Sequence, residues 1–299
     1  MTSRTVAAIL CLALASWVLP GEARQRATRE RDVLISVLDK SDKPAPGIVP
    51  ADLTVREDGV AREVLRVEPS TAPLQVMVLV DTSAGTQLLI PDLRKGVQVL
   101  AGTLWGLTPD TEVGLMEFGE RPTLLADLSR SATLLDKGIG RLFEHTGAGA
   151  YMMEAVVDAA KSLQKREARH PVIVVFTTEA SREFSSQISQ RVEEALKNAR
   201  NASLWAIELH DARPPAEASD EERQRNIVLG DVTAKSGGAR ETLLDRMNIE
   251  AQFAKLGARL TSQCVVTYSR PDSLVPPSKL EVTIKRSGLR VLAPRWSGQ

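Results

Sequence analysis

The sequence has few aromatic residues and no excess of charge of either sign. Phe, Trp and Tyr make up 4% of its 299 residues, and 38 Lys and Arg balance 38 Asp and Glu. A neutral chain has no overall electrostatic attraction to nucleic acid or to an anionic membrane. We also find no basic stripe interleaved with aromatic residues. We therefore expect a protein that does not bind nucleic acid.

Cysteine is also scarce, because Cys11 and Cys264 are the only two in the sequence. Cys11 lies within the apolar segment 6–19, which follows Arg4 and precedes "PGEA". This order is typical of a secretory signal peptide, which we place at residues 1–23; an uncleaved anchor is the alternative. After cleavage no disulfide within the chain is possible, so a hydrophobic core must stabilise the protein. We expect a periplasmic or secreted protein with no stable membrane insertion after cleavage.

Several motifs of catalysis are absent. The glycine pattern of dinucleotide-binding folds and the phosphate-binding loop GxxxxGK[ST] do not occur. The GxSxG elbow of hydrolases is missing, because Asp81 stands two residues before Ser83. The three histidines have no metal-ligand spacing. We therefore do not expect an enzyme. An envelope hydrolase that uses Asp81 and Ser83 is the last of the alternatives, since the sequence places no base near Ser83.

The middle of the chain, residues 74–262, alternates between strand-like and helix-like segments. "LQVMVLVD" and "PVIVVFTT" are nearly continuous apolar runs, typical of strands buried on both faces. "AYMMEAVVDAAKSLQK" has helical spacing. Ser131 is a candidate N-cap for another, shorter helix that begins directly after Ser131. The alternation predicts a doubly wound α/β fold with a mainly parallel sheet and helices on both faces.

Both ends of the chain have the short patterns of β structure. In the segment 31–70, "DVLISVLD" predicts one strand, and "ADLTVREDGVAREVLRVE" predicts two more in a hairpin around Asp58 and Gly59. In the segment 263–299, "CVVTYSR", "KLEVTIKR" and "LRVLAP" predict three strands. Neither segment is large enough to bury a core alone, and chain ends often lie close together. We expect them to form one small β domain beside the α/β domain.

The chain resembles the von Willebrand factor type A domain, and more closely the exported bacterial von Willebrand-related family. The resemblance rests on "DLTVREDGVAREVLRVE", "VMVLVDTSAG", "YMMEAVVDAAKSL", "VIVVFTTEA" and "LEVTIKRSGLRVLAPR". It implies a metal-ion-dependent adhesion site, in which hydroxyl and carboxylate oxygens bind Mg²⁺ and the ion accepts a carboxylate from a partner protein. The family pattern is Asp-x-Ser-x-Ser after the first core strand, a threonine at a helix start and an aspartate after the central strand.

Only part of that ligand pattern is present. Asp81 and Ser83 match its first two positions, whereas Gly85, Ala150 and Thr178 stand at the other three. Two of these replacements have no side-chain oxygen, which leaves one carboxylate and two hydroxyls for an ion that requires near-octahedral oxygen coordination. We therefore expect a degenerate site without a cofactor, in which Asp81 and Ser83 form hydrogen bonds with the loop backbone.

The main interpretation is an exported, non-enzymatic binding or adhesion-type module that recognises a protein or an envelope component. A metal-dependent adhesion module with shifted ligands is the first alternative. In that case Glu179, Thr86 and Thr146, which lie near the three lost positions, would join Asp81 and Ser83 around Mg²⁺.

Overall fold

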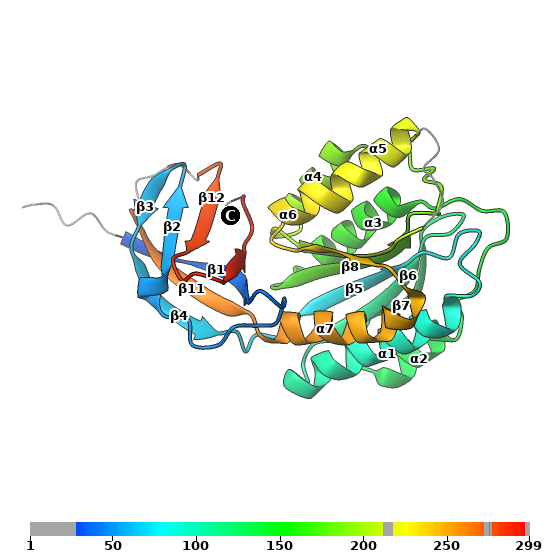
Figure 1. The fold of residues 1–299 in the computed structure, drawn as a ribbon, viewed down its shortest axis with the longest axis horizontal. Coiled ribbons are helices and arrows are strands. Elements are labelled where there is room, and N and C mark those ends of the chain that lie inside the picture. Colours follow the sequence, from blue (N-terminus) through cyan, green and yellow to red (C-terminus); the bar gives the residue numbers. More distant parts are fainter. Residues whose placement is uncertain (1–27, 212–217, 272–274, 276, 297–299) are drawn as a thin grey trace, which may run out of the picture.

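The computed structural model describes residues 28–211, 218–271, 275 and 277–296, which form two parts lying side by side (Figure 1). The expected signal peptide, residues 1–23, lies outside the described residues. Within the described ranges, no helix combines the length and the apolar character that a bilayer span requires.

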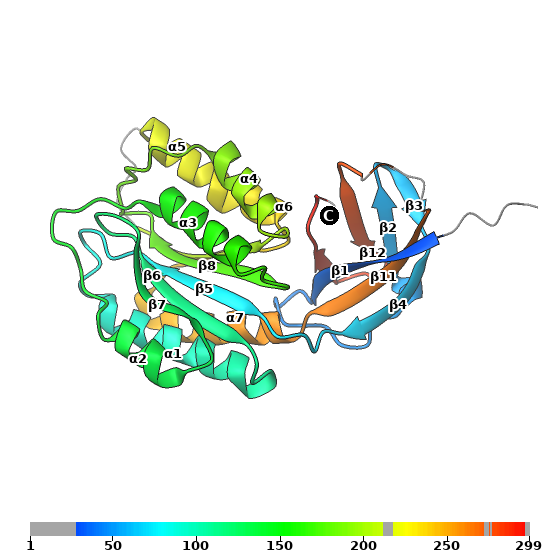
Figure 2. The ribbon, with the colours of Figure 1, turned by 180° about the vertical axis from the view of Figure 1, so that it is seen from behind.

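The larger part is a six-stranded sheet with helices on both faces, as Figures 1 and 2 show. The strand order is β10-β9-β8-β5-β6-β7, and β7 alone runs antiparallel to its neighbour in this sheet of described residues. The strands are β5 Gln75–Val80, β6 Glu112–Glu117, β7 Thr123–Ser129, β8 Pro171–Thr178, β9 Ser203–Leu209 and β10 Arg240–Leu243. The helices are α1 Ile90–Leu107, α2 Ala132–Ile139, α3 Met152–Lys165, α4 Ser189–Asn198, α5 Asp220–Ile227, α6 Thr233–Lys235 and α7 Ile249–Thr261. The predicted doubly wound α/β fold is confirmed.

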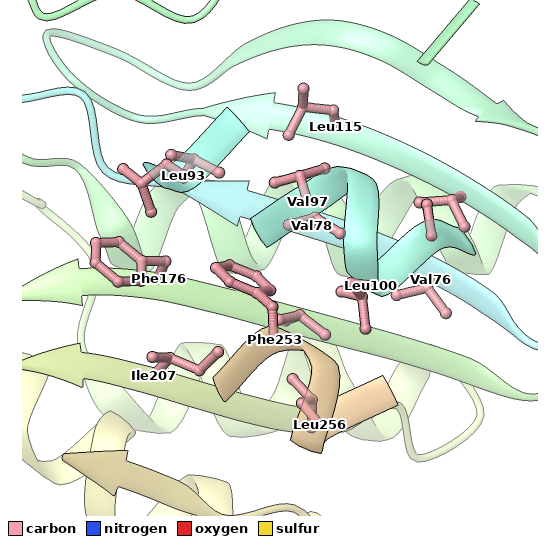
Figure 3. Close-up of a cluster of buried hydrophobic side chains, with 14 of the residues drawn as sticks. Val76, Val78, Leu93, Val97, Leu100, Leu115, Phe176, Ile207, Phe253 and Leu256 are labelled. Atoms are coloured by element: carbon pink, nitrogen blue, oxygen red, sulfur yellow. The ribbon is translucent and has the colours of Figure 1, made fainter. Parts of the chain in front are cut away.

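Two apolar layers hold the sheet in place, because β5 and β8 are buried on both faces. Val76 and Val78 face a cluster with α1 and α7 that includes Phe253 (Figure 3). Met77 and Leu79 point to the other face, into a cluster with α3 and α4. Burial of one such side chain contributes roughly 1.5–3 kcal/mol. The two layers therefore fix where β5 and β8 end, and with them the loops that follow.

The smaller part is built from both ends of the chain. One sheet has the order β13-β1-β11-β4 and the other has the order β12-β2-β3. The strands are β1 Thr28–Leu38, β2 Leu53–Glu57, β3 Val60–Arg62, β4 Val64–Pro69, β11 Cys264–Pro271, β12 Leu280–Ile284 and β13 Arg290–Leu292. Val33 and Ile35 of β1 share one apolar core with Val55 of β2 and Val282 of β12. The fold class, in which head and tail together add a small β structure, is confirmed.

The head segment differs from the expectation in one respect. The hairpin forms at Asp58 and Gly59, whose φ angles are 46° and 83°. The expectation of a single strand after this turn was wrong, because the chain breaks into β3 and β4. Strand β3 pairs with β2, whereas β4 pairs with β11 in the other sheet. A chain that passes between the two sheets of a small sandwich bends at the corner, and the bend lies at Glu63.

Two groups of contacts join the α/β part to the β part. At one, the buried Arg259 of α7 donates a hydrogen bond to the carbonyl oxygen of Asp42 and pairs with Glu241. At the other, the backbone N–H of Arg295 donates to the carbonyl oxygen of Lys235 at 2.8 Å. Trp296 beside it packs into the helical layer that contains α4.

Candidate functional site

Three loops meet at the carboxyl end of the sheet, where the family resemblance places its metal site. The loop after β5 is joined to the loop after α2, since Ala84 N–H donates to the carbonyl oxygen of Ala148 at 3.0 Å. The loop after β8 is joined to the same segment, since Ala150 N–H donates to Arg182 O and Phe184 N–H donates to Ala150 O, both at 2.8 Å. The structure therefore brings the three loops to one place.

Asp81 is fully buried at the end of β5, and the protein itself occupies both of its carboxylate oxygens. Ser83 donates to Oδ1 through its backbone N–H at 3.0 Å and through its hydroxyl at 2.6 Å. Thr177 donates its hydroxyl to Oδ2 at 2.8 Å. Buried polar groups must find such partners, and hydrogen bonds to charged groups are the stronger kind. The carboxylate is thus already satisfied without an ion.

A chain of hydroxyl groups continues from this carboxylate into the loop after β8. The hydroxyl oxygens of Ser83 and Ser181 lie 3.2 Å apart, and those of Ser181 and Thr178 lie 3.1 Å apart. Thr178 Oγ1 also accepts the backbone N–H groups of Ala180 and Ser181, at 3.1 and 3.2 Å. Thr178 therefore closes the turn that follows its own strand, as short polar side chains do in loops.

The other two replaced positions offer no side-chain oxygen, and the backbone at one and the surroundings at the other disfavour one. Gly85 has a φ of 94°, a conformation that favours glycine, and its N–H donates to Glu144 at 2.6 Å. Ala150 is fully buried, and its methyl group belongs to the apolar cluster beneath α3. The backbone conformation therefore favours glycine at position 85, and the apolar surroundings favour an apolar side chain at position 150.

The shifted ligand set is not assembled around Asp81. Glu179 lies beside the neighbouring strand, where its Oε2 is 2.6 Å from Nδ1 of His210 and accepts Asp211 N–H. Thr86 donates its hydroxyl to the carbonyl oxygen of Ser83 at 2.8 Å, and Thr146 is exposed. Among the described residues, no group of three or more His, Cys, Asp or Glu side chains is arranged to hold a metal ion. The donors present do not fit an octahedral Mg²⁺ site.

Glu183 is a buried carboxylate at this end of the sheet that the sequence analysis missed. Its Oε1 accepts the N–H of Met152, the first residue of α3, at 3.1 Å, and both the N–H and the hydroxyl of Ser185. Its Oε2 is buried with no partner among the described residues. The pKa of this carboxyl is raised from 4.5 to about 7, chiefly by burial; the charge of Asp81 also raises it, while Ser185 and Arg225 lower it. By accepting the first N–H of α3, Glu183 satisfies a backbone donor that the helix itself leaves without a partner.

A buried network of charged side chains binds the loop after β8. Arg225 of α5 donates to the carbonyl oxygens of Ser181 and Thr178, at 2.8 and 3.3 Å. It also pairs with Glu208, which pairs with Arg240 as well. Because removing one member of a buried pair leaves the other charge unpaired, this network fixes the loop in its position.

Ser83 has the surroundings of a structural residue. Its side chain is 1% exposed, and its hydroxyl is held by Asp81. The two histidines at this end have glutamates as partners: His145 lies 3.2 Å from Glu117, and His210 contacts Glu179. A nucleophile also needs access to the substrate, and the burial of both Ser83 and the Asp81 carboxylate that accepts its hydroxyl denies that access.

Comparisons with known proteins bear on the fold and not on the function. No family model and no curated protein matches the sequence. A solved von Willebrand factor type A protein from Catenulispora acidiphila is 11% identical, with a TM-score of 0.48, over 91% of this chain and 75% of its own. BatB from Bacteroides thetaiotaomicron, described as a conserved hypothetical protein, is 14% identical, with a TM-score of 0.45, over 63% of this chain and 100% of its own. Proximal thread matrix protein 1 from the mussel byssus is 14% identical, with a TM-score of 0.50, over 65% of this chain and 49% of its own.

The topology of the sheet defines the class of the fold. The α/β part is a von Willebrand type A-like domain, as the resemblance in the sequence predicted. Identities of this size show the fold alone, because one fold carries many functions.

Proposed function

We propose that this chain is an exported, non-enzymatic module that binds a protein or an envelope component at the carboxyl end of its sheet, without a metal ion. The hydrogen bonding of Asp81 carries the proposal. Ser83 and Thr177 occupy both oxygens of the carboxylate on which a metal site would depend. A bound Mg²⁺ would have to displace these hydrogen bonds and would gain one carboxylate in return.

Exposed apolar side chains at the same end support a binding role. Leu88 follows β5, Phe143 lies after α2, Phe184 follows β8, and Leu244 and Met247 follow β10; each is at least half exposed. Large apolar side chains gathered at one end of a domain are typical of protein interaction sites. In this arrangement the partner is recognised by apolar contact instead of by a carboxylate bound to an ion.

Two further interactions hold this surface in place. Arg246 donates to the carbonyl oxygen of Leu88 at 3.0 Å, which joins the loops after β10 and β5. The guanidinium of Arg94 lies 4.9 Å from the centre of the Phe143 ring and donates to the carbonyl oxygen of Leu142. A surface that is ordered before binding loses less entropy when a partner docks.

Export is proposed from the N-terminal sequence alone. Sequencing of the chain recovered from the periplasm or the medium should begin at Arg24 or within a few residues of it. Recovery of the chain with an intact Met1 in the membrane fraction would support the anchor instead.

Capture of partners by the exported chain, with EDTA or with Mg²⁺, tests the binding site. The double variant Leu244→Asp and Met247→Asp should lose the captured partner, because charges cannot be buried in an apolar contact. A control double variant on the β part, Val49→Asp and Val60→Asp, should keep it, since both side chains are about half exposed and lie in the other part of the molecule. The captured amount should be the same with EDTA as with Mg²⁺. Loss of capture in EDTA, or retention by the Leu244 and Met247 variant, would contradict the proposal.

A further inference from the structure

A crevice of about 760 Å³ lies between the two parts, at the end of the sheet opposite the candidate site. One wall is formed by β1, β4 and β11, and the other by the turns that lead into β8 and β9. Figures 1 and 2 show β1 and β11 next to the start of β8. Ligand pockets typically measure 300–1,000 Å³ and lie preferentially between domains. The crevice has the size and the place of a binding site.

Three basic side chains gather on the wall formed by the α/β part. The parallel register pairs Val172 of β8 with Ser203 of β9. Arg169 and Arg200 therefore stand at matching positions before adjacent strands, and both line the crevice. His170 lies within the influence of both charges, because burial lowers its pKa and Arg169 and Arg200 lower it further. The two arginines therefore form one positive region.

The charged side chains on the opposite wall have polar partners on that same wall. Arg66 of β4 lies 2.6 Å from Glu30 and 3.6 Å from Glu68, and Asp32 accepts the hydroxyl of Thr267 at 2.6 Å. Among the described residues, by contrast, neither Arg169 nor Arg200 has an ion-pair partner. Arg169 and Arg200 are thus the charged lining residues that have no polar partner among the described residues, and an anion would pair with them.

A buried acceptor without a partner also lines the crevice. Gln263, the residue directly before β11, is 4% exposed. Its Nε2 donates a hydrogen bond to the hydroxyl oxygen of Ser36 at 3.2 Å. Its Oε1 has no hydrogen-bond partner among the described residues. A buried acceptor left in this state is costly, and an N–H or O–H from a ligand would remove that cost.

We infer that the crevice binds a small organic anion that also carries a hydrogen-bond donor, in the class of hydroxy- and amino-carboxylates. The carboxylate lies between Arg169 and Arg200, and the hydroxyl or ammonium group donates to Gln263 Oε1. The apolar residues Val265, Val172 and Pro171 line the crevice between these polar groups and contact the carbon skeleton.

Calorimetric titration with malate and succinate tests the inference, because the two dicarboxylates differ by one hydroxyl group. Malate should bind at millimolar concentration or below, and succinate should bind about tenfold more weakly for lack of the donor to Gln263. The double variant Arg169→Gln and Arg200→Gln should weaken malate binding by at least about tenfold. A control with two exposed arginines at the other end of the sheet, Arg121→Gln and Arg182→Gln, should bind malate as the natural chain does.

Replacement of Gln263 separates the donor contact from the charge contact. Gln263→Met keeps the volume and removes the acceptor, so malate and succinate should bind it equally, at the strength that succinate has for the natural chain. Should this variant fail to fold, the natural chain and the two arginine variants still decide the matter. No binding of malate by the natural chain, equal binding of both anions to it, or full binding by the Arg169 and Arg200 variant would overturn the inference. The outcome is independent of capture at the carboxyl end, which uses other variants.

Discussion

Two buried polar side chains at opposite ends of the α/β sheet, Asp81 and Gln263, differ in their hydrogen bonding. At the carboxyl end, Asp81 resembles a metal ligand in the sequence, yet Ser83 and Thr177 occupy its oxygens. At the amino end, Gln263 has a buried oxygen without a partner among the described residues, and Arg200, which lines the crevice, has no ion-pair partner among them. A group that already has protein partners gains little from a ligand, whereas an unpartnered group gains a full hydrogen bond. The hydrogen-bond partners of a side chain, and not its match to a motif, decide whether it is free to bind.

The largest effect is expected from removal of the Asp81 carboxylate. Asp81→Ala would leave two hydroxyls and one N–H buried without their acceptor, which should lower the free energy of unfolding by about 3 kcal/mol or more. Urea denaturation in EDTA measures this change. Asp136→Ala, which removes one exposed contact with Gln98, serves as the control and should change stability by less than about 0.5 kcal/mol. If Asp81→Ala were as stable as the natural chain in EDTA, Asp81 would not have the structural role described above.

Glu183 should give the stability a dependence on pH that one substitution removes. Its pKa in the folded protein, about 7, lies above the ordinary value of 4.5. Its contribution is therefore fully present below pH 4.5 and is lost as the pH rises through about 7, a decrease of about 2–3 kcal/mol between pH 5 and pH 8. Glu183→Gln cannot ionise, so the difference in stability between this variant and the natural chain should shift in favour of the variant over that range. A constant difference from pH 5 to pH 8 would show that the Glu183 carboxyl titrates normally.

Restoring the family threonine at Ala150 should destabilise the protein instead of creating a ligand. The methyl group of Ala150 lies in an apolar cluster, so the added hydroxyl of Ala150→Thr would be buried there at a cost of about 1–3 kcal/mol. Ala84→Thr, at an exposed position in the loop after β5, is the matched control and should be nearly neutral. Thermal melting of both variants distinguishes the two sites. An Ala150→Thr variant that is unchanged in EDTA and stabilised by Mg²⁺ would reverse this conclusion.

The smallest effect is expected on the pKa of His170, at the amino end of the sheet. Arg169 and Arg200 both lower the pKa of His170, although burial is the larger cause. The Arg169→Gln and Arg200→Gln double variant should therefore raise the pKa of His170 while leaving it below the ordinary value. Nuclear magnetic resonance titration of the histidine ring measures this shift. A pKa that does not move would mean that the two guanidinium groups lie farther from His170 than described.

The sequence was a good guide where one short pattern determines one element. The apolar runs predicted β5 and β8, and Ser131 caps α2 by accepting Leu134 N–H at 3.3 Å. The partner of Asp81 could also have been found, because aligning the ends of the two apolar runs pairs Val80 with Phe176 and so places Thr177 level with Asp81.

Other features depend on contacts between distant segments and leave no local signal. Glu183 lies in the irregular segment between β8 and α4, where no periodicity shows that its carboxylate reaches Met152 in α3. The crevice exists only because the two parts of the chain face each other, so no motif predicts that Gln263 and Arg200 line one cavity. The break between β3 and β4 likewise follows from the presence of two sheets in the small part.

The central claim is that hydrogen bonds within the protein satisfy Asp81 at the carboxyl end of the sheet, so that this carboxylate needs no ion. Thermal melting of the natural chain, in EDTA and then in increasing Mg²⁺ and Mn²⁺, tests it most directly. An ion that binds only the folded state would stabilise it by roughly 2.7 kcal/mol at a hundredfold excess over the dissociation constant. We predict the same melting temperature at every concentration of either ion. A rise of several degrees in Mg²⁺ that disappears in Asp81→Ala would contradict the claim and restore Asp81 as a metal ligand.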